Sequence, residues 1–99
     1  MKARNGILRG EYKVKDGKLI KCIISIKNGK IENIKISGDF FMYPEEKIEE
    51  LEEKLKGIEY KEENIKKALN EFFKEVEVIG ADKQHFLKLI MEAKPTYRI

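Results

Sequence analysis

The N-terminal part of the chain alternates apolar with polar residues, a period of two that predicts half-buried β-strands. The pattern runs through residues 7–15 (ILRGEYKVK), 19–27 (LIKCIISIK) and 30–37 (KIENIKIS). Asp16-Gly17 and Asn28-Gly29 separate these runs. Both dipeptides favour the tight turns of β-hairpins, because their residues tolerate positive φ angles. We therefore predict a three-stranded antiparallel meander.

The two sides of this sheet differ in character. The apolar side consists of Leu8, Tyr12, Val14, Ile20, Cys22, Ile24, Ile26, Ile34 and Ile36. The basic side consists of Arg9, Lys13, Lys15, Lys21, Lys27 and Lys35. Lysine is common on exposed strands and protects sheets against aggregation, so the basic side fits a solvated face. A surface that docks a partner or attracts phosphates is the alternative.

The second half of the chain changes to the helical period. Pro44 fits the first position of a helix that Gly57 closes. A second helix covers about 62–74, and a third begins after the N-cap Asp82 and ends by Lys94, because a proline follows. With Phe73 and Met91 at the margins of the pattern, the apolar positions are Ile48, Leu51, Leu55, Ile65, Leu69, Phe72, Phe86, Leu87 and Ile90.

The order of these elements predicts the fold class. Strands first and helices afterwards indicate an α+β fold of two layers, a three-stranded meander packed on about three helices. Residues 76–79 (VEVI) fit either a short fourth strand or an extended link, and the pattern does not decide between them. A length of 99 residues suits one small domain, 1–99, with a single hydrophobic core.

Composition and charge indicate where the protein is located and suggest adaptation to heat. No apolar run reaches the roughly 20 residues of a membrane span, and the first ten residues lack the apolar stretch of a signal peptide, so we expect a cytoplasmic protein. Charged residues make up 39% of the chain, and their bias toward Lys and Glu is typical of heat-adapted proteins. The net charge of +3 combines a basic segment, 1–38, with an acidic one, 39–77.

Few residues are suited to catalysis. His85 is the only histidine and Cys22 the only cysteine, so the chain has neither a His/Cys metal cluster nor an internal disulfide. We expect His85 at the surface or at a helix terminus, and Cys22 as a buried, unreactive thiol. The glycines match neither a phosphate-binding loop nor the dinucleotide fingerprint. The carboxylates from Glu45 to Glu63 lie among lysines at helical spacing and are expected to form ion pairs at the surface.

The segment Ser37-Gly38-Asp39-Phe40-Phe41 is unusual, because two large aromatic residues lie between a strand and a helix. A carboxylate such as Asp39 at a strand end usually accepts hydrogen bonds from nearby backbone N–H groups, and we favour that role over catalysis. Successive residues of an extended chain point to opposite sides. One Phe can therefore anchor the helix layer while the other belongs to a docking surface; the alternative is that both pack under the loop.

A small basic domain also invites a nucleic-acid partner. Tyr12 is the only aromatic residue in the predicted strands, and it lies on the apolar side. The basic side therefore lacks the stacking platform of single-strand binders, and the acidic helices would repel phosphates. Nucleic-acid binding is the alternative function class, together with a generic protein-interaction domain.

The order of motifs resembles the small C-terminal domain of lipoate-protein ligases, from about Tyr12 to Gly57. In some archaea this domain resembles a separate accessory subunit of a split ligase. The resemblance rests on Gly17-Lys18-Leu19-Ile20, on Ile36-Ser37-Gly38-Asp39-Phe40-Phe41 at the end of the Ile-rich strand, and on Pro44-Glu45 before Ile48, Leu51, Glu52, Leu55 and Gly57.

The resemblance implies a partner rather than a self-sufficient enzyme. In this family the large domain holds the lipoate pocket, the ATP site and the catalytic lysine, and the small domain is needed to activate lipoate as its adenylate. The chain would be a stand-alone subunit in a heterodimer with the large catalytic subunit, with no activity, catalytic residue, metal site or cofactor of its own. ATP, Mg and lipoate would bind in the complex, and lipoyl-domain proteins would accept the product.

The same resemblance implies a set of partner-binding or adenylation-supporting residues. The ammonium of Lys18 is expected to reach a phosphate or carboxylate on the partner. The full set is Lys18, Gly38, Asp39, Phe40 and Phe41.

Overall fold

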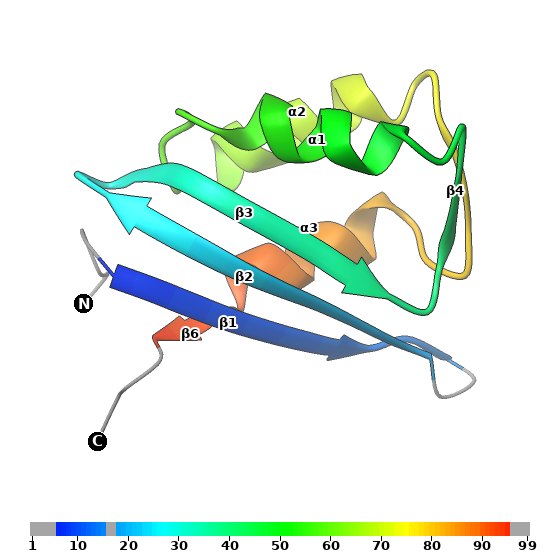
Figure 1. The fold of residues 1–99 in the computed structure, drawn as a ribbon, viewed down its shortest axis with the longest axis horizontal. Helices are drawn as coiled ribbons and strands as arrows, with labels where there is room; N and C mark the ends of the chain where they lie inside the picture. The colour runs from blue at the N-terminus through cyan, green and yellow to red at the C-terminus, as the bar shows by residue number, and fades with distance from the viewer. Residues whose placement is uncertain (1–5, 16–17, 96–99) are drawn as a thin grey trace.

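The computed structural model of the chain describes residues 6–15 and 18–95, in a two-layer α+β arrangement that confirms the predicted fold class (Figure 1). The predicted Asp16-Gly17 turn lies outside the described residues. The helices are α1 (Lys47–Leu55), α2 (Glu62–Phe72) and α3 (Lys83–Met91). The strands are β1 (Gly6–Lys13), β2 (Leu19–Lys27), β3 (Lys30–Gly38), β4 (Phe41–Tyr43), β5 (Glu77–Ile79) and β6 (Lys94–Pro95).

The main sheet has the strand order β3-β2-β1-β6, and the predicted meander forms its first three strands. Asn28 and Gly29 both have positive φ angles, 55° and 76°, and join β2 to β3 as the predicted two-residue hairpin turn. The fourth strand is β6, which pairs with β1 through Leu8 and Arg9. Helix α3 consequently ends at Met91 and not at the predicted Lys94, because residues 94–95 belong to the sheet.

A β-bulge adjusts the apolar face of β3. Ser25 lies opposite Asn33 and Ile26 lies opposite Ile31, so β3 contains one extra residue between these pairs. Ile31 and Ile34 therefore both face the core although they are three positions apart. The simple period of two missed Ile31 for this reason.

Strands β4 and β5 form a separate two-stranded antiparallel sheet, which we call the ribbon. The possible fourth strand at 76–79 is thus a strand, but one that pairs with residues 41–43 instead of the meander. The prediction that Pro44 begins a helix is wrong. The chain up to Tyr43 pairs with β5, residues 44–46 form a turn in which Lys47 N donates to Pro44 O at 3.0 Å, and α1 starts at Lys47.

The three helices cover one face of the main sheet, and the opposite face is open (Figure 1). Helix α3 approaches closely at Gly10, where a Cβ atom would lie 2.8 Å from Leu89 O. No helix in the described part of the chain is long and apolar enough to cross a membrane. The core consists of Leu8, Val14, Ile20, Cys22, Ile24, Ile26, Ile31, Ile34, Ile36, Leu51, Leu55, Ile65, Ala68, Leu69, Ala81, Phe86, Leu89 and Ile90.

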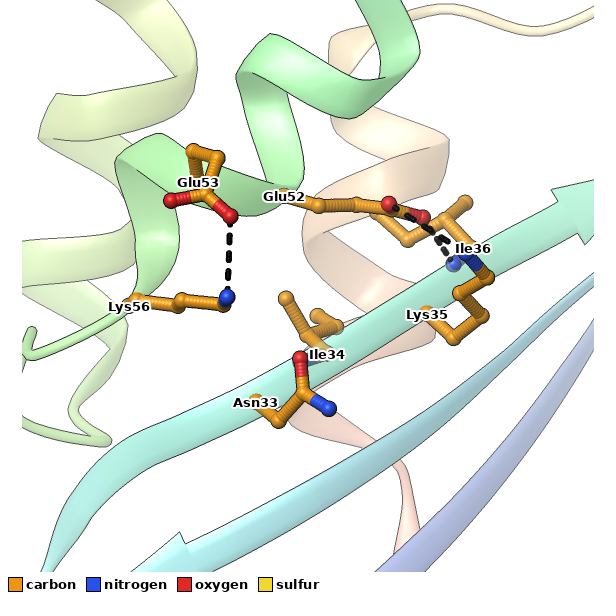
Figure 2. Close-up of polar contacts among 7 residues, drawn as sticks. All are labelled: Asn33, Ile34, Lys35, Ile36, Glu52, Glu53 and Lys56. Carbon is orange, nitrogen blue, oxygen red and sulfur yellow. Dashed lines mark hydrogen bonds and ion pairs between the residues drawn. The ribbon is translucent and has the colours of Figure 1, made fainter.

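Strand β3 forms one edge of the main sheet, and α1 and the segment after it pair three of its outward backbone groups. Ile31 N donates to Ile58 O at 2.9 Å, and Ile31 O accepts from Gly57 N at 2.7 Å. Ile36 N donates to the Glu52 Oε2 atom at 2.8 Å (Figure 2). An edge covered in this way is protected from pairing with a strand of another chain.

Glu52 is the exception to the expected surface carboxylates. Its side chain is buried against β3, with Oε1 4.0 Å from Lys35 Nζ, whereas Glu53 forms an exposed ion pair with Lys56 at 2.8 Å (Figure 2). The expectation of a surface ion pair is therefore wrong for Glu52. Its place inside the apolar stripe of α1 is the signal that distinguishes it in the sequence.

Replacing Glu52 with alanine should lower the free energy of unfolding by about 1–3 kcal/mol, because the Ile36 N–H loses its acceptor in a buried position. Urea unfolding of Glu52→Ala measures this loss. Glu53→Ala is the matched control one residue along the helix and should change stability by less than about 0.5 kcal/mol. Equal effects of the two substitutions would show that the hydrogen bond to Ile36 is unimportant.

Candidate functional site

The five predicted site residues come together at one end of the main sheet. Lys18 directly precedes β2, Gly38 ends β3, and Phe41 begins β4. This is the place where the chain leaves the sheet layer toward the helix layer, through the β4 segment at the end of the molecule (Figure 1). The candidate site therefore forms around the segment 37–41, which is unusual in the sequence for its two adjacent aromatic residues.

Gly38 permits close contact between the ends of β3 and β2. Its φ angle is +143°, and a Cβ atom at this position would lie 2.5 Å from Leu19 O and 2.7 Å from Ile20 Cα. Both neighbours are backbone atoms of a central strand and cannot move aside. A glycine is therefore required here for packing as well as for conformation.

Asp39 holds the chain against the start of β2 by two hydrogen bonds. Asp39 N donates to Leu19 O at 2.9 Å, and Leu19 N donates to Asp39 Oδ2 at 3.1 Å. The expected role as an acceptor of backbone N–H groups is confirmed. The pair of bonds fixes the direction in which the next two residues leave the sheet.

Phe40 and Phe41 point in different directions. Phe40 is half-buried and lies edge-on to the fully buried Phe86, with ring centroids 5.2 Å apart and an interplanar angle of 88°. Phe86 in turn lies 5.6 Å from the ring of Phe73. Phe41, by contrast, is 66% exposed. The alternative in which both rings pack under the loop is wrong, and Phe40 is the one that anchors the helix layer.

Lys18 lies beside the segment that follows β5. Its Nζ atom is 3.6 Å from the position that a Cβ on Gly80 would occupy, and the same position is 2.9 Å from Asp39 O. Lys18 has no ion-pair partner among the described residues. Its ammonium is therefore available at the end of the ribbon.

His85 and Cys22 have structural positions. His85 Nδ1 accepts from Asp82 N at 3.1 Å, while Asp82 Oδ1 accepts from Gln84 N and His85 N, so the pair forms a capping box at the start of α3. Burial raises the pKa of the Cys22 thiol from 9.0 to about 12. The expected position of His85 at a helix terminus and the expected burial of Cys22 are confirmed. No group of three or more His, Cys, Asp or Glu in the described ranges could hold a metal ion.

Tyr43 and Ile79 belong to the same surface as Phe41 and were missed in the sequence. Phe41 lies opposite Ile79 in the ribbon, and Tyr43 lies two residues along β4, so the three side chains share one face. Tyr43 and Ile79 are each 49% exposed, whereas the intervening Met42 is buried. Phe41-Met42-Tyr43 is apolar throughout, so no period-two pattern marks this short strand in the sequence.

Replacing Gly38 with alanine should lower the free energy of unfolding by about 1–3 kcal/mol, because the methyl group meets the backbone of β2. Chemical denaturation measures the change. The exposed neighbour Ser37 supplies the control, and Ser37→Ala should have an effect below about 0.5 kcal/mol. A Gly38→Ala variant as stable as the parent chain would contradict the close contact with Leu19 O.

The Cys22 thiol should resist modification in the folded protein. The raised pKa keeps it protonated at pH 8, and burial excludes the reagent. The stabilisation from the neutral thiol is complete below pH 9 and is lost as the pH rises toward 12, because the folded-state pKa lies above the ordinary value. Labelling with a chromogenic disulfide at pH 8 should be slow in buffer and fast in denaturant; fast labelling in buffer would contradict the buried position.

Comparison with known proteins places this arrangement in a family. Residues 8–90 match the family described as bacterial lipoate protein ligase C-terminus. The chain is 34% identical over 80 residues to lipoate-protein ligase A subunit 2 of Thermoplasma acidophilum, an alignment that covers 80% of this chain and 82% of the relative.

A solved structure has the same fold. It comes from an archaeal lipoylation system of Thermoplasma acidophilum, described as a bi-partite lipoate protein ligase and its E2 lipoyl domain. The TM-score is 0.79 at 30% identity, and the match covers 87% of this chain and 96% of that chain. The match over 8–90 and the identity to a ligase subunit together establish that this chain belongs to the family of lipoate protein ligase C-terminal domains.

Proposed function

We propose that this chain is the accessory subunit of a bipartite lipoate-protein ligase, which binds a large catalytic subunit and enables ATP-dependent activation of lipoate to lipoyl-AMP. The observation that carries the proposal is the match to a protein named as subunit 2 of such a ligase, over 82% of that protein's length. The chain thus corresponds to nearly the whole of a separate subunit, and the relative's description as bi-partite supports a heterodimer.

The substrates and acceptor follow from the same proposal. ATP, Mg and lipoate bind in the complex, and a lipoyl-domain protein accepts the lipoyl group, in keeping with the E2 lipoyl domain described with the relative. The described residues offer no cluster of His, Cys, Asp and Glu suited to a metal ion. We assign Mg–ATP to the large subunit, as the family resemblance implies.

An accessory subunit can act without chemistry of its own. A protein that binds one conformation of its partner more tightly than another shifts the partner toward that conformation. Three of the residues with reactive groups that the sequence singled out, Asp39, His85 and Cys22, are occupied with backbone hydrogen bonds or buried, and Lys18 is the exception. This supports stabilisation of an ATP-competent large subunit over donation of a catalytic group.

The position of Tyr12 argues against the nucleic-acid alternative. Its ring lies 5.6 Å from His85 and 6.0 Å from Lys88 Nζ, on the side of the sheet that α3 covers. The open face of β1, β2 and β3 therefore presents no aromatic ring among the described residues, and single strands would have nothing to stack on.

The proposal predicts that lipoyl-AMP forms only when both subunits are present. The large ligase subunit of the same organism is incubated with lipoate and Mg–ATP, with and without this chain, and lipoyl-AMP is measured directly. We expect product only in the mixture, because neither chain alone has the complete, ATP-competent site.

Two controls give this experiment its meaning. This chain alone, with lipoate and Mg–ATP, should form no adenylate. An unrelated small domain of similar charge should not replace it. A large subunit that is equally active alone, and that does not co-purify with this chain, would refute the accessory role.

A further inference from the structure

The ribbon presents an apolar face to solvent. Phe41, Tyr43 and Ile79 are the apolar residues of this ribbon face, with exposed fractions of 66%, 49% and 49%, and Glu77 opposite Tyr43 is its fourth residue. The other large apolar side chains that are exposed in the described part of the chain, Ile7 and Ile23, lie on the open face of the main sheet among Arg9, Lys21 and Lys35. The ribbon face is thus the exposed surface where aromatic and aliphatic residues adjoin without interspersed cations.

The ribbon is held rigidly from behind. Met42 is buried, and Val78 opposite it packs on the core. Where β4 begins, Phe40 is anchored on Phe86 and Asp39 is bonded to the start of β2. The ribbon face is therefore preorganised, which lowers the entropy lost when a partner binds.

The rim of the ribbon face has charges of opposite sign at its two ends. Lys18 lies beside Gly80, just after Ile79. Glu77 lies opposite Tyr43 and is exposed. A complementary partner has an apolar pocket with an anionic group near Lys18 and a cationic group near Glu77.

The size of the ribbon argues for a concave partner over a second copy of this chain. A strand of three residues is about 10 Å long, and two strands give a flat face on the order of 100 Å². Stable interfaces bury about 800 Å² on each partner, so two such faces pressed together are too small. A groove can also enclose the outer edges of β4 and β5, where no further strand pairs in the part of the chain that the structure describes.

We infer that the ribbon face inserts into an apolar groove of the large catalytic subunit and is the main anchor of the heterodimer, an inference that rests on the proposed function. It divides the predicted site residues into two groups. Phe41 and Lys18 contact the partner, together with Tyr43 and Ile79. Gly38, Asp39 and Phe40 position the ribbon and contact this chain only.

The test compares truncations on the two exposed apolar surfaces. Phe41→Ala and Ile79→Ala remove side chains of the ribbon face, and Ile7→Ala and Ile23→Ala remove matched aliphatic side chains from the open sheet face. Titration calorimetry with the purified large subunit should show that Phe41→Ala weakens binding about thirtyfold or more. The Ile79→Ala variant should weaken it by a smaller factor, and the two controls should leave it within about twofold.

A second measurement separates anchoring from chemistry. At a concentration of the Phe41→Ala variant high enough to saturate the large subunit, the rate of lipoyl-AMP formation should return to that of the parent complex. Thermal unfolding of each variant alone should remain unchanged, because these side chains are exposed. A saturated Phe41→Ala complex that stays inactive would overturn the role as an anchor.

Other outcomes overturn the inference in different ways. If the Ile7 and Ile23 variants lose affinity and the ribbon variants do not, the open sheet face is the interface and the accessory role stands. If light scattering shows a dimer of this chain that Phe41→Ala dissociates, a second copy occupies the ribbon. If the parent chain neither binds nor activates the large subunit, the proposed function fails together with the inference.

Discussion

The two hydrogen bonds between Asp39 and Leu19 hold the chain where it passes from the sheet to the helix layer, and the candidate site depends on them. They are possible because Gly38 lets the end of β3 lie against the backbone of β2. With the exit direction fixed, Phe40 meets Phe86 inside the core and Phe41 is turned to solvent. The local backbone geometry therefore decides how the ribbon face is oriented and leaves its Phe41 side chain 66% exposed.

The helices cover one face of the main sheet only. The β3 edge, the open sheet face and the ribbon differ in how they are covered and in which side chains they carry. The β3 edge is covered by α1 and the segment after it, with Glu52 accepting from the buried Ile36 N–H. The open face carries basic side chains, a composition that fits a solvated face. The ribbon has neither protection, because its strands pair with no further strand among the described residues and its outer face exposes Phe41, Tyr43 and Ile79. An exposed apolar surface beside a covered edge and a basic face is typical of a site that binds a partner protein.

An accessory role fits a domain whose polar groups serve its own architecture. The capping box of Asp82 and His85 starts α3, Asp39 fixes the chain exit, and Tyr60 Oη donates to Ile90 O at 2.6 Å. In the proposed function, a subunit built in this way would influence its catalytic partner through binding energy, by favouring one of the partner's conformations. For such a role, the shape and orientation of the surface that contacts the partner matter more than any reactive group.

The sequence by itself determined the features that depend on neighbours along the chain. Period-two alternation and Asn28-Gly29 predicted the meander, Asp82 predicted the start of α3, and adjacent Phe40 and Phe41 predicted opposite orientations. Tertiary structure alone decided the pairing of residues 41–43 with 77–79, the addition of β6 beside β1, and the burial of Glu52 against Ile36. These contacts join segments far apart in sequence, and their free energy comes from the packed layers that bring them together, which local patterns do not encode.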